Sequence, residues 1–486
     1  MARTTYSFII IYLTNLVSVS NRYGHVPVQT NLQDEFKVND EAIGSIMAIF
    51  YIPFVITAII YGYLGDRYNR KLILVLTTTV QSIGVAGCGF SGNMMTFYAA
   101  KILIGVTQSA CITLAPTVIS DMYHGVDRTK MLGVFATSVA IGSGVGMMGM
   151  GALSKIYGRQ NSFLVFAGLT LSMAILYLMF VPDYERGGNE KETLKSNENP
   201  DSSKKNSIID DCICLCKNAT YMAAIFAFAA TSSVCETTIV WYQELIRRLL
   251  ILQPRQEINP CKQDYSTDVD KYCLDSDFPN ATDSSTSIYS NINCNRCESK
   301  QISDIFGIIL LTCGLVGTMS GIVLVQILIK KSSNAGPKVA SAGQITTSVL
   351  MLILIFYLKD LSTMLIWIST AIILIFATSC FGIIQDVIAR VIVPERRGLA
   401  VSLQNLVGRA IGSSFPPILA GKMSDYYLQT SISNIENAKA ENIDVLYQDF
   451  RFESLKSAFY IVPAYAILSG LVWMISARKF KNNELK

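Results

Sequence analysis

The sequence predicts an all-α membrane protein with twelve transmembrane helices in two pseudo-symmetric halves of six. Of its 486 residues, 51% are hydrophobic and only 16% are charged, whereas a water-soluble chain of this length would carry more charge. Twelve apolar segments each approach the length of about twenty residues that a helix needs to cross a bilayer. A polar segment at 183–217 separates the first six segments from the last six. Two six-helix halves around a central cavity are typical of transporters built from repeats.

The spans follow in order along the chain. In the first half, residues 1–182, we expect them at about 6–28, 41–64, 72–91, 94–121, 130–152 and 161–182. In the second half, residues 218–477, we expect them at about 218–245, 301–329, 339–358, 362–391, 398–420 and 457–477. The first apolar segment runs on to Asn21 and Arg22 without a small-residue cleavage site, so we interpret it as a spanning helix rather than a signal peptide.

Three polar segments complete the organisation. Residues 183–217, rich in Gly, Asn, Ser, Lys and Glu, are expected to form a flexible linker. Residues 246–300 form a long loop between the seventh and eighth spans, and residues 478–486 form a short tail. The net charge of +4 is too small to indicate a nucleic-acid partner, so we expect the bilayer and its lipids to be the partners of a monomer.

Lys and Arg residues in the short loops set the predicted orientation. They gather on one side of the membrane: Arg67, Arg70, Lys71, Arg128, Lys130, Lys330, Lys331, Lys338, Arg396, Arg397, Arg478, Lys479 and Lys481. The positive-inside rule makes this side cytoplasmic, together with the linker and both termini. Lys155 and Arg159 fall on the opposite side and are exceptions to the rule.

The stretch GYLGDRYNRK joins the second and third spans. Gly62 and Gly65 would let two helices approach closely, and four charged residues would form a cytoplasmic clip: Asp66, Arg67, Arg70 and Lys71. The spacing is similar to the signature loop of major facilitator transporters, G-x-L-x-D-R-x-G-R-K, with Asn69 at a Gly position. Asn tolerates the left-handed backbone that such a turn would need. The alternative is an ordinary basic loop that follows the positive-inside rule.

A faint internal repeat also involves charged helix ends. Asp121 ends the fourth span and Arg128 precedes the fifth, while Asp386 near the end of the tenth span is followed by Arg390 and Arg396. We expect these charges to hold the cytoplasmic face when it is closed. The alternative is a set of independent charges at helix ends.

The cysteines divide by compartment. The long outer loop contains Cys261, Cys273, Cys294 and Cys297, which we expect to form two disulfides in one of three pairings, with a zinc site as the rival interpretation. Asn280 in the same loop begins an Asn-Ala-Thr glycosylation motif. On the cytoplasmic side, Cys212, Cys214 and Cys216 are either palmitoylated or free thiols.

Ionisable residues within spans are costly in lipid, so they usually face a cavity or a partner. Four such residues are Arg22, Lys101, Glu236 and Arg409, and Gln108 shares a helix face with Lys101. Three cations and one acid indicate a site for an anionic or zwitterionic solute. The alternatives are snorkelling of Lys101 to the interface and structural pairing of Arg22 with Glu236. His25, one turn beyond Arg22, is either a pH sensor or a plain interface histidine.

Together these motifs resemble the Spinster branch of the major facilitator superfamily. Besides GYLGDRYNRK, the similar residues are Leu114 to Thr117 leading to Asp121, Arg128 with Met131 and Leu132, Gly142 to Gly144, Asp304 to Gly307, Pro394 with Arg396 and Arg397, Pro417, and Gly421 to Asp425. The resemblance covers nearly the whole chain. It implies movement of a lysophospholipid or sphingoid lipid, such as sphingosine 1-phosphate, by alternating access. Cations would bind the phosphate, and Gly142, Gly144 and Gly146 would let helices slide closely.

The chain departs from that branch where coupling chemistry would lie. Asn21 stands at the usual Asp of span one, Gln108 at the usual Glu of span four, Lys101 at its Arg, and Arg409 at an eleventh-span His. Asn and Gln keep hydrogen bonding but cannot take up a proton. We therefore expect either that Glu236 carries the proton or that the protein is a uniporter.

Two rival functions stay open at this stage. One is a facilitator of small organic anions or sugars, and the other is a non-transporting membrane receptor or scaffold. We expect neither an enzyme nor a cofactor or metal site, because no phosphate-binding Gly loop, nucleophile constellation or His-containing metal cluster is evident. An oxidised, glycosylated outer loop is compatible with the plasma membrane and with a lysosomal or late endosomal membrane.

Overall fold

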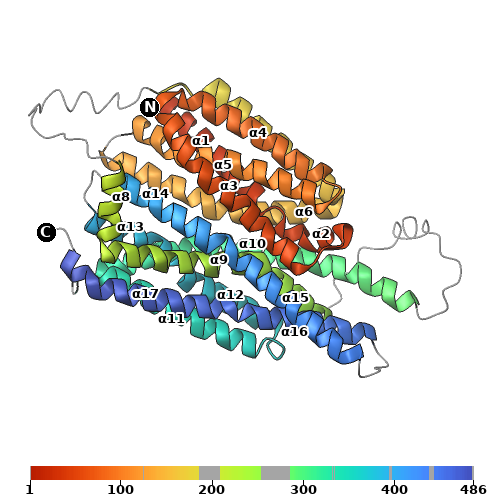
Figure 1. Cartoon of the computed structure of the whole chain (residues 1–486). Helices are drawn as coiled ribbons and strands as arrows, with labels where there is room; N and C mark the ends of the chain where they lie inside the picture. Colours follow the sequence, from red (N-terminus) through yellow and green to blue (C-terminus); the bar gives the residue numbers. More distant parts are fainter. Residues whose placement is uncertain are drawn as a thin grey trace, which may run out of the picture.

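The computed structural model describes residues 2–123, 125–184, 208–252, 285–330, 332, 334–392, 397–436 and 443–483. Figure 1 shows two helical bundles side by side, one from α1 to α6 and the other from α8 to α17. Both chain termini lie at the same end of the molecule, which we call the terminal face. The opposite end carries α2 and α16, and we call it the α2 face.

The first bundle contains six rods. Its long helices are α1 (Ala2–Tyr23), α3 (Asp40–Arg67), α4 (Arg70–Phe90), α5 (Met94–Met122) and α6 (Gly125–Phe180). Gly158 interrupts α6 with a φ of 76°, a conformation that glycine adopts without steric cost, so α6 supplies two antiparallel rods. The expected spans at 130–152 and 161–182 correspond to these rods. Short helices η1 (Val26–Val28) and α2 (Gln29–Phe36) connect α1 to α3.

The second bundle also contains six rods, two of which are broken. Its continuous rods are α9 (Ala219–Leu252), α10 (Ser285–Leu328), α11 (Ala335–Phe356) and α17 (Ile461–Asn483). The broken rods are α12 (Thr363–Thr378) with α13 (Cys380–Val391), and α14 (Arg397–Val407) with the π-helix η5 (Gly408–Ser413) and α15 (Phe415–Glu436). Two further helices are α8 (Ile208–Lys217), within the expected linker, and α16 (Ile443–Phe459).

The predicted fold class is confirmed by this arrangement. In the described ranges, nine helical stretches are long and apolar enough to cross a membrane, and one of these is the double-length α6. The two remaining rods are α1 and the α14–η5–α15 rod, which carry Arg22 and Arg409 respectively. Dividing α6 at Gly158 and adding these two rods gives the twelve expected spans.

Asparagine caps begin three helices of the first bundle. The side chains of Asn39, Asn69 and Asn93 accept hydrogen bonds from the backbone amides of Ala42 (3.2 Å), Leu72 (2.9 Å) and Thr96 (2.9 Å). Such caps satisfy amides that have no partner inside the helix. Asn69 has a φ of −61°, so the expectation of a left-handed backbone there was wrong, and the residue instead serves as the cap of α4.

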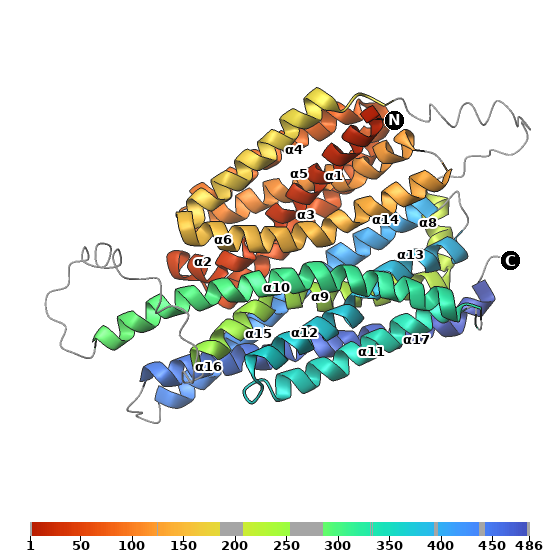
Figure 2. The same ribbon diagram turned by 180° about the vertical axis from the view of Figure 1, so that it is seen from behind.

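Small residues allow the rods to pack closely. A Cβ atom on Gly142 or Gly146 of α6 would lie 2.6 Å or 2.5 Å from backbone oxygens of α1. On Gly144 it would lie 2.8 Å from the carbonyl oxygen of Gly307 in α10. Figure 2 shows α6 and α10 running side by side, where the two halves meet. The second contact between the halves joins α3 to α15 and η5.

Candidate functional site

A buried polar cluster lies where α1, α3, α5, α9 and η5 meet. We call it the central cluster, and its members are Arg22, Tyr23, Tyr51, Gln108, Glu236 and Arg409. Tyr51 lies about 16 Å along α3 from the start of this helix at Asp40, so the cluster is deep within the bundle. Four of the five predicted binding residues are therefore brought together.

Arg22 is the most enclosed cation of the cluster, with 1% of its surface exposed. Its Nε donates to Gln108 Oε1 (3.1 Å), and its Nη1 donates to the Tyr51 hydroxyl (3.2 Å). Four aromatic rings surround the guanidinium with centroids 5.2–5.8 Å away, those of Tyr23, Phe50, Tyr51 and Phe54. Cation–π contacts of this kind stabilise a desolvated positive charge.

Glu236 of α9 is the acid of the cluster. Its Oε1 accepts hydrogen bonds from Tyr51 (2.6 Å) and Tyr23 (3.1 Å), and it pairs with Arg409 Nη1 (3.3 Å). Arg409 also donates to the Tyr51 hydroxyl (3.2 Å). It lies on η5, and π-helical turns inside helices are frequent at functional sites. Because the tyrosines belong to one half and the ion pair to the other, Glu236 links the two halves.

Several polar atoms of the cluster are unpaired. Among the described residues, buried atoms without a hydrogen-bond partner include Arg22 Nη2, Gln108 Nε2 and Glu236 Oε2. A buried polar group without a partner costs free energy, so such atoms usually mark a ligand or water site. Two of the three are donors on residues that already touch each other, which is the donor set that an anion requires.

Lys101 does not join the central cluster. Its Nζ lies 3.3 Å from the carbonyl oxygen of Asn21, 3.2 Å from that of Arg22 and 3.4 Å from His25 Nδ1. It is fully buried, so it does not snorkel to the interface. The ammonium instead binds the last carbonyls of α1, where cations stabilise a helix end, and so holds the turn that carries Arg22.

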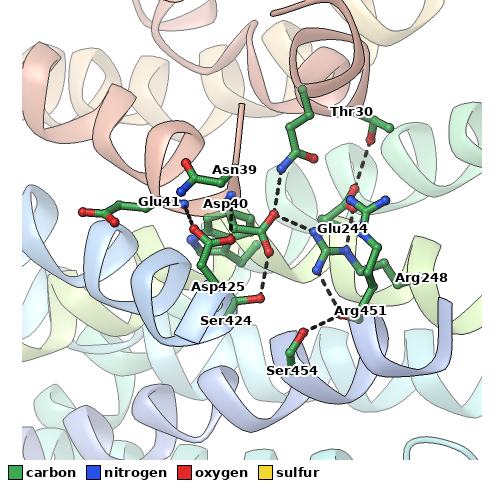
Figure 3. A network of polar contacts seen from close by, with 12 residues as sticks. Thr30, Asn39, Asp40, Glu41, Glu244, Arg248, Ser424, Asp425, Arg451 and Ser454 are labelled. Carbon is green, nitrogen blue, oxygen red and sulfur yellow. Dashed lines mark hydrogen bonds and ion pairs between the residues drawn. The ribbon is translucent and has the colours of Figure 1, made fainter. Parts of the chain in front are cut away.

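A second network closes the α2 face, as Figure 3 shows. Arg248 donates to Asp40 Oδ1 (2.7 Å) and to Glu244 Oε1 (2.8 Å), and these three side chains are 1–5% exposed. The hydroxyl of Ser424 donates to Asp40 Oδ2 (2.7 Å). Since Asp40 begins α3 while Arg248 and Ser424 lie on α9 and α15, the network joins the two halves.

Asp425 strengthens the same junction. Its carboxylate oxygens accept from the backbone amides of Asp40 (3.1 Å) and Glu41 (2.8 Å), at the N-terminus of α3 (Figure 3). A helix N-terminus attracts negative charge, so the acid of one half caps a helix of the other. We call the set Asp40, Glu244, Arg248, Ser424 and Asp425 the α2-face network. The sequence does not by itself indicate this network, although Glu244 and Arg248 are four residues apart on one helix face.

Two charged pairs among the described residues of the terminal face lie within single halves. Arg70 Nη1 pairs with Asp121 (2.6 Å), and its Nε donates to the carbonyl of Gly65 (3.0 Å). Asp386 pairs with Arg390 (2.9 Å) one turn along α13. The first pair joins α4 to α5 and the second lies along α13, so neither of the two joins the halves.

The other residues predicted to gate this face contribute in different ways. A Cβ on Gly65 would lie 2.2 Å from Leu114 Cδ2, so α3 and α5 are in close contact there, whereas Gly62 is less crowded. Arg67 stacks over the Tyr63 ring at 4.3 Å, and Lys71 is partly exposed. The side chains of Asp66 and Arg128, and all of Arg396, lie outside the described residues.

The outer-loop predictions also fall outside the described part of the chain. Cys261, Cys273 and Asn280 are not described, and Cys294 and Cys297 are described only as backbone positions of α10. The two disulfides and the glycosylation site stay predictions.

Known proteins resemble this chain over most of its length. The family model described as Major Facilitator Superfamily matches residues 11–249. The sphingosine-1-phosphate transporter SPNS2 of Danio rerio is 26% identical over 98% of this chain and 84% of its own length. Protein spinster homolog 3 of Danio rerio is 24% identical over 96% of this chain and 84% of its own length.

A solved structure agrees in fold. The crystal structure of a bacterial homologue of the human lysosomal transporter Spinster, in an inward-facing and unoccupied conformation, superposes with a TM-score of 0.75. It covers 100% of this chain and 99% of its own, at 15% sequence identity. By these comparisons the chain is related to the Spinster membrane transporters of the major facilitator superfamily.

Proposed function

We propose that this protein carries a lysophospholipid or a phosphorylated sphingoid lipid, such as sphingosine 1-phosphate, across a membrane by alternating access. The observation that carries the proposal is the pair of unpaired donors, Arg22 Nη2 and Gln108 Nε2, buried at the junction of the two halves. The naming of relatives as sphingosine-1-phosphate transporters supports the same class of solute.

The headgroup site would consist of Arg22, Gln108 and Arg409, with Glu236 beside them. A guanidinium offers a phosphate a planar set of donors, and in a water-excluded site these bonds are stronger than at the surface. The aromatic rings around Arg22 and the apolar helix faces next to it would contact the lipid chain. An amphiphile matches both parts of this environment, whereas a sugar would leave the charge of Arg22 without an anionic partner.

Alternating access would proceed by rocking of the two halves about the central cluster. The structure is closed at the α2 face by the Asp40–Arg248 ion pair and its neighbours. We propose that the terminal face is cytoplasmic, in the plasma membrane or a lysosomal membrane. We also propose uniport, because Asn21 and Gln108 stand where the family usually has acids and cannot carry a proton.

Uptake of labelled sphingosine 1-phosphate into proteoliposomes tests the proposal. Arg22→Gln removes the buried cation and should lower the uptake rate about tenfold or more, since charge-assisted bonds in a desolvated site are worth several kcal/mol. Arg478→Gln makes the same substitution at an exposed site and should match wild type. Accumulation should be equal with and without a pH gradient.

Three outcomes would contradict the proposal. Competition by sugars or carboxylates but not by lysolipids would indicate a small-solute facilitator. Lipid binding without any flux would indicate a receptor or scaffold. Accumulation that depends on the pH gradient would overturn uniport.

A further inference from the structure

We propose that Glu236 acts as an internal competitor of the lipid headgroup. Its carboxylate binds the donors of the central cluster while the carrier is empty, and an anionic headgroup displaces it. This inference rests on the proposed function and adds a role for an acid that phosphate binding alone does not require.

Glu236 already makes the contacts that a bound anion would make. Its Oε1 accepts hydrogen bonds from Tyr51, Tyr23 and Arg409 at distances of up to 3.3 Å, and the Glu236 side chain is 5% exposed. Tyr51 is the shared point, because its hydroxyl also accepts from Arg22 and Arg409. A phosphate that binds the unpaired Nη2 of Arg22 would therefore be separated from the Glu236 carboxylate only by the hydroxyl of Tyr51, which bonds to both residues.

The charges do not permit both anions to bind equally well. Arg22 and Arg409 supply two positive charges, and Arg409 already pairs with Glu236 (3.3 Å). Lys101 adds little, because its ammonium is held by the carbonyls of Asn21 and Arg22. A phosphomonoester brings a charge of about −1.5 to −2 near pH 7. Two anions sharing one buried site repel each other, so the carboxylate must move away as the headgroup binds.

Displacement of Glu236 would also change how the two halves are joined. The bonds from Tyr23 and Tyr51 to Glu236 cross from one half to the other. When the headgroup binds Arg22 and Gln108 of the first half, these central bonds are lost. Substrate would thus loosen the middle of the molecule, whereas an empty carrier would stay linked there. Binding of the headgroup would in this way be coupled to the rocking of the two halves.

Headgroup selectivity follows from the same competition. A phosphomonoester with nearly two charges should displace the carboxylate more readily than a zwitterionic phosphodiester. Removing the charge of Glu236 should therefore improve binding of anionic lipids and leave neutral lipids unaffected.

The test measures binding to the full-length protein in nanodiscs, with sphingosine 1-phosphate and neutral monooleoylglycerol as probes. Glu236→Gln should bind sphingosine 1-phosphate about tenfold more tightly because the competing charge is gone. Its affinity for monooleoylglycerol should equal that of wild type. Glu236→Asp keeps the charge and should not show the gain, and Asp360→Asn, an exposed acid of the α11–α12 loop, is the matched control.

A second measurement does not depend on the lipid. Without any ligand, Glu236→Gln should speed hydrogen–deuterium exchange in η5 and the middle of α3, because the bonds that join the halves there are weaker without the charge of the acceptor. Faster exchange without sphingosine 1-phosphate binding by any variant would support the role of Glu236 and contradict the proposed substrate. Unchanged exchange, or an affinity gain that extends to monooleoylglycerol, would overturn the competitor role.

Discussion

Arg248 contacts groups from several helices within the α2-face network. Its guanidinium binds Asp40 and Glu244, and its Nη1 donates to the carbonyl oxygen of Arg451 (3.0 Å). Figure 3 shows Asp40, Glu244 and Arg451 around Arg248, and these residues come from α3, α9 and α16. A buried ion pair of this kind adds modest net stability, but the loss of one partner leaves an unpaired buried charge.

Arg248→Gln should therefore favour opening of the α2 face. Removal of the cation leaves the buried Asp40 carboxylate without an ion-pair partner, at a cost of about 3–5 kcal/mol to the closed state, whereas Glu244 keeps its pair with Arg247 (2.7 Å). Hydrogen–deuterium exchange at the first turn of α3 and in α15 measures the opening. Lys359→Gln removes a cation whose side chain is 42% exposed. It should change hydrogen–deuterium exchange little, because exposed ion pairs contribute about 0–1 kcal/mol. Equal exchange in both variants would contradict the assigned role of Arg248.

Some residues of the central cluster can be predicted from the sequence and others cannot. Arg22, Glu236 and Arg409 stand out because ionisable groups are rare within apolar spans, and the structure brings them together. Lys101 has the same signal but lies against backbone carbonyls, a contact that depends on where α1 ends. Tyr51, which joins both arginines to the acid, could not be found, because a tyrosine in a span has an ordinary packing role.

At the scale of elements, α3 is the helix that bridges the halves. It starts in the α2-face network, passes the central cluster at Tyr51 and ends in the loop at the terminal face. Near its start, a Cβ on Gly44 would lie 2.4 Å from the carbonyl oxygen of Pro417 in α15. The closed α2 face therefore requires two helices to touch through their backbones.

Gly44→Ala should disfavour this closure. The clash is with backbone rather than with a flexible side chain, so α3 and α15 must separate, at a cost of about 1–3 kcal/mol to the closed state. Transport should slow, and a cysteine introduced at a buried position of α15, Ala420→Cys, should become accessible to water-soluble thiol reagents. Gly168→Ala on α6 meets no atom within 4 Å and is the matched control. Wild-type accessibility in Gly44→Ala would show that the two helices do not need this contact.

The elements that sequence patterns missed are those with polar or short sequences. Apolar runs predicted the spans, but α2 and α16 are short, mixed helices at the α2 face. Arg159, an exception to the positive-inside rule, is explained by its partners. Its guanidinium makes two bonds to Glu35 of α2 (2.7 and 2.8 Å) and also binds backbone carbonyls of Cys88 and Ser91. A residue so fixed is structural, and its charge is no guide to topology.

At the scale of the whole molecule, both termini lie at one face and the α11–α12 loop lies with α16 at the other. Epitope tags at either terminus should therefore become accessible when digitonin opens the plasma membrane alone. A tag at Asp360 should be accessible on intact cells if the protein is in the plasma membrane, and only after full solubilisation if it is in lysosomes. If the terminal tags and the Asp360 tag became accessible together under every condition, this result would contradict the proposed topology.

The two faces of the molecule are held in different ways. Ion pairs and helix caps join the halves at the α2 face, whereas Arg70–Asp121 and Asp386–Arg390 each stay within one half at the terminal face. An inhibitor that enters from the α2 face would have to break the Asp40–Arg248 pair and its neighbours to reach the central arginines, whereas entry from the side of the termini avoids this cost. If that side is cytosolic, a useful compound has to be membrane-permeable, and a charged phosphate mimic would need a cleavable masking group to enter the cell.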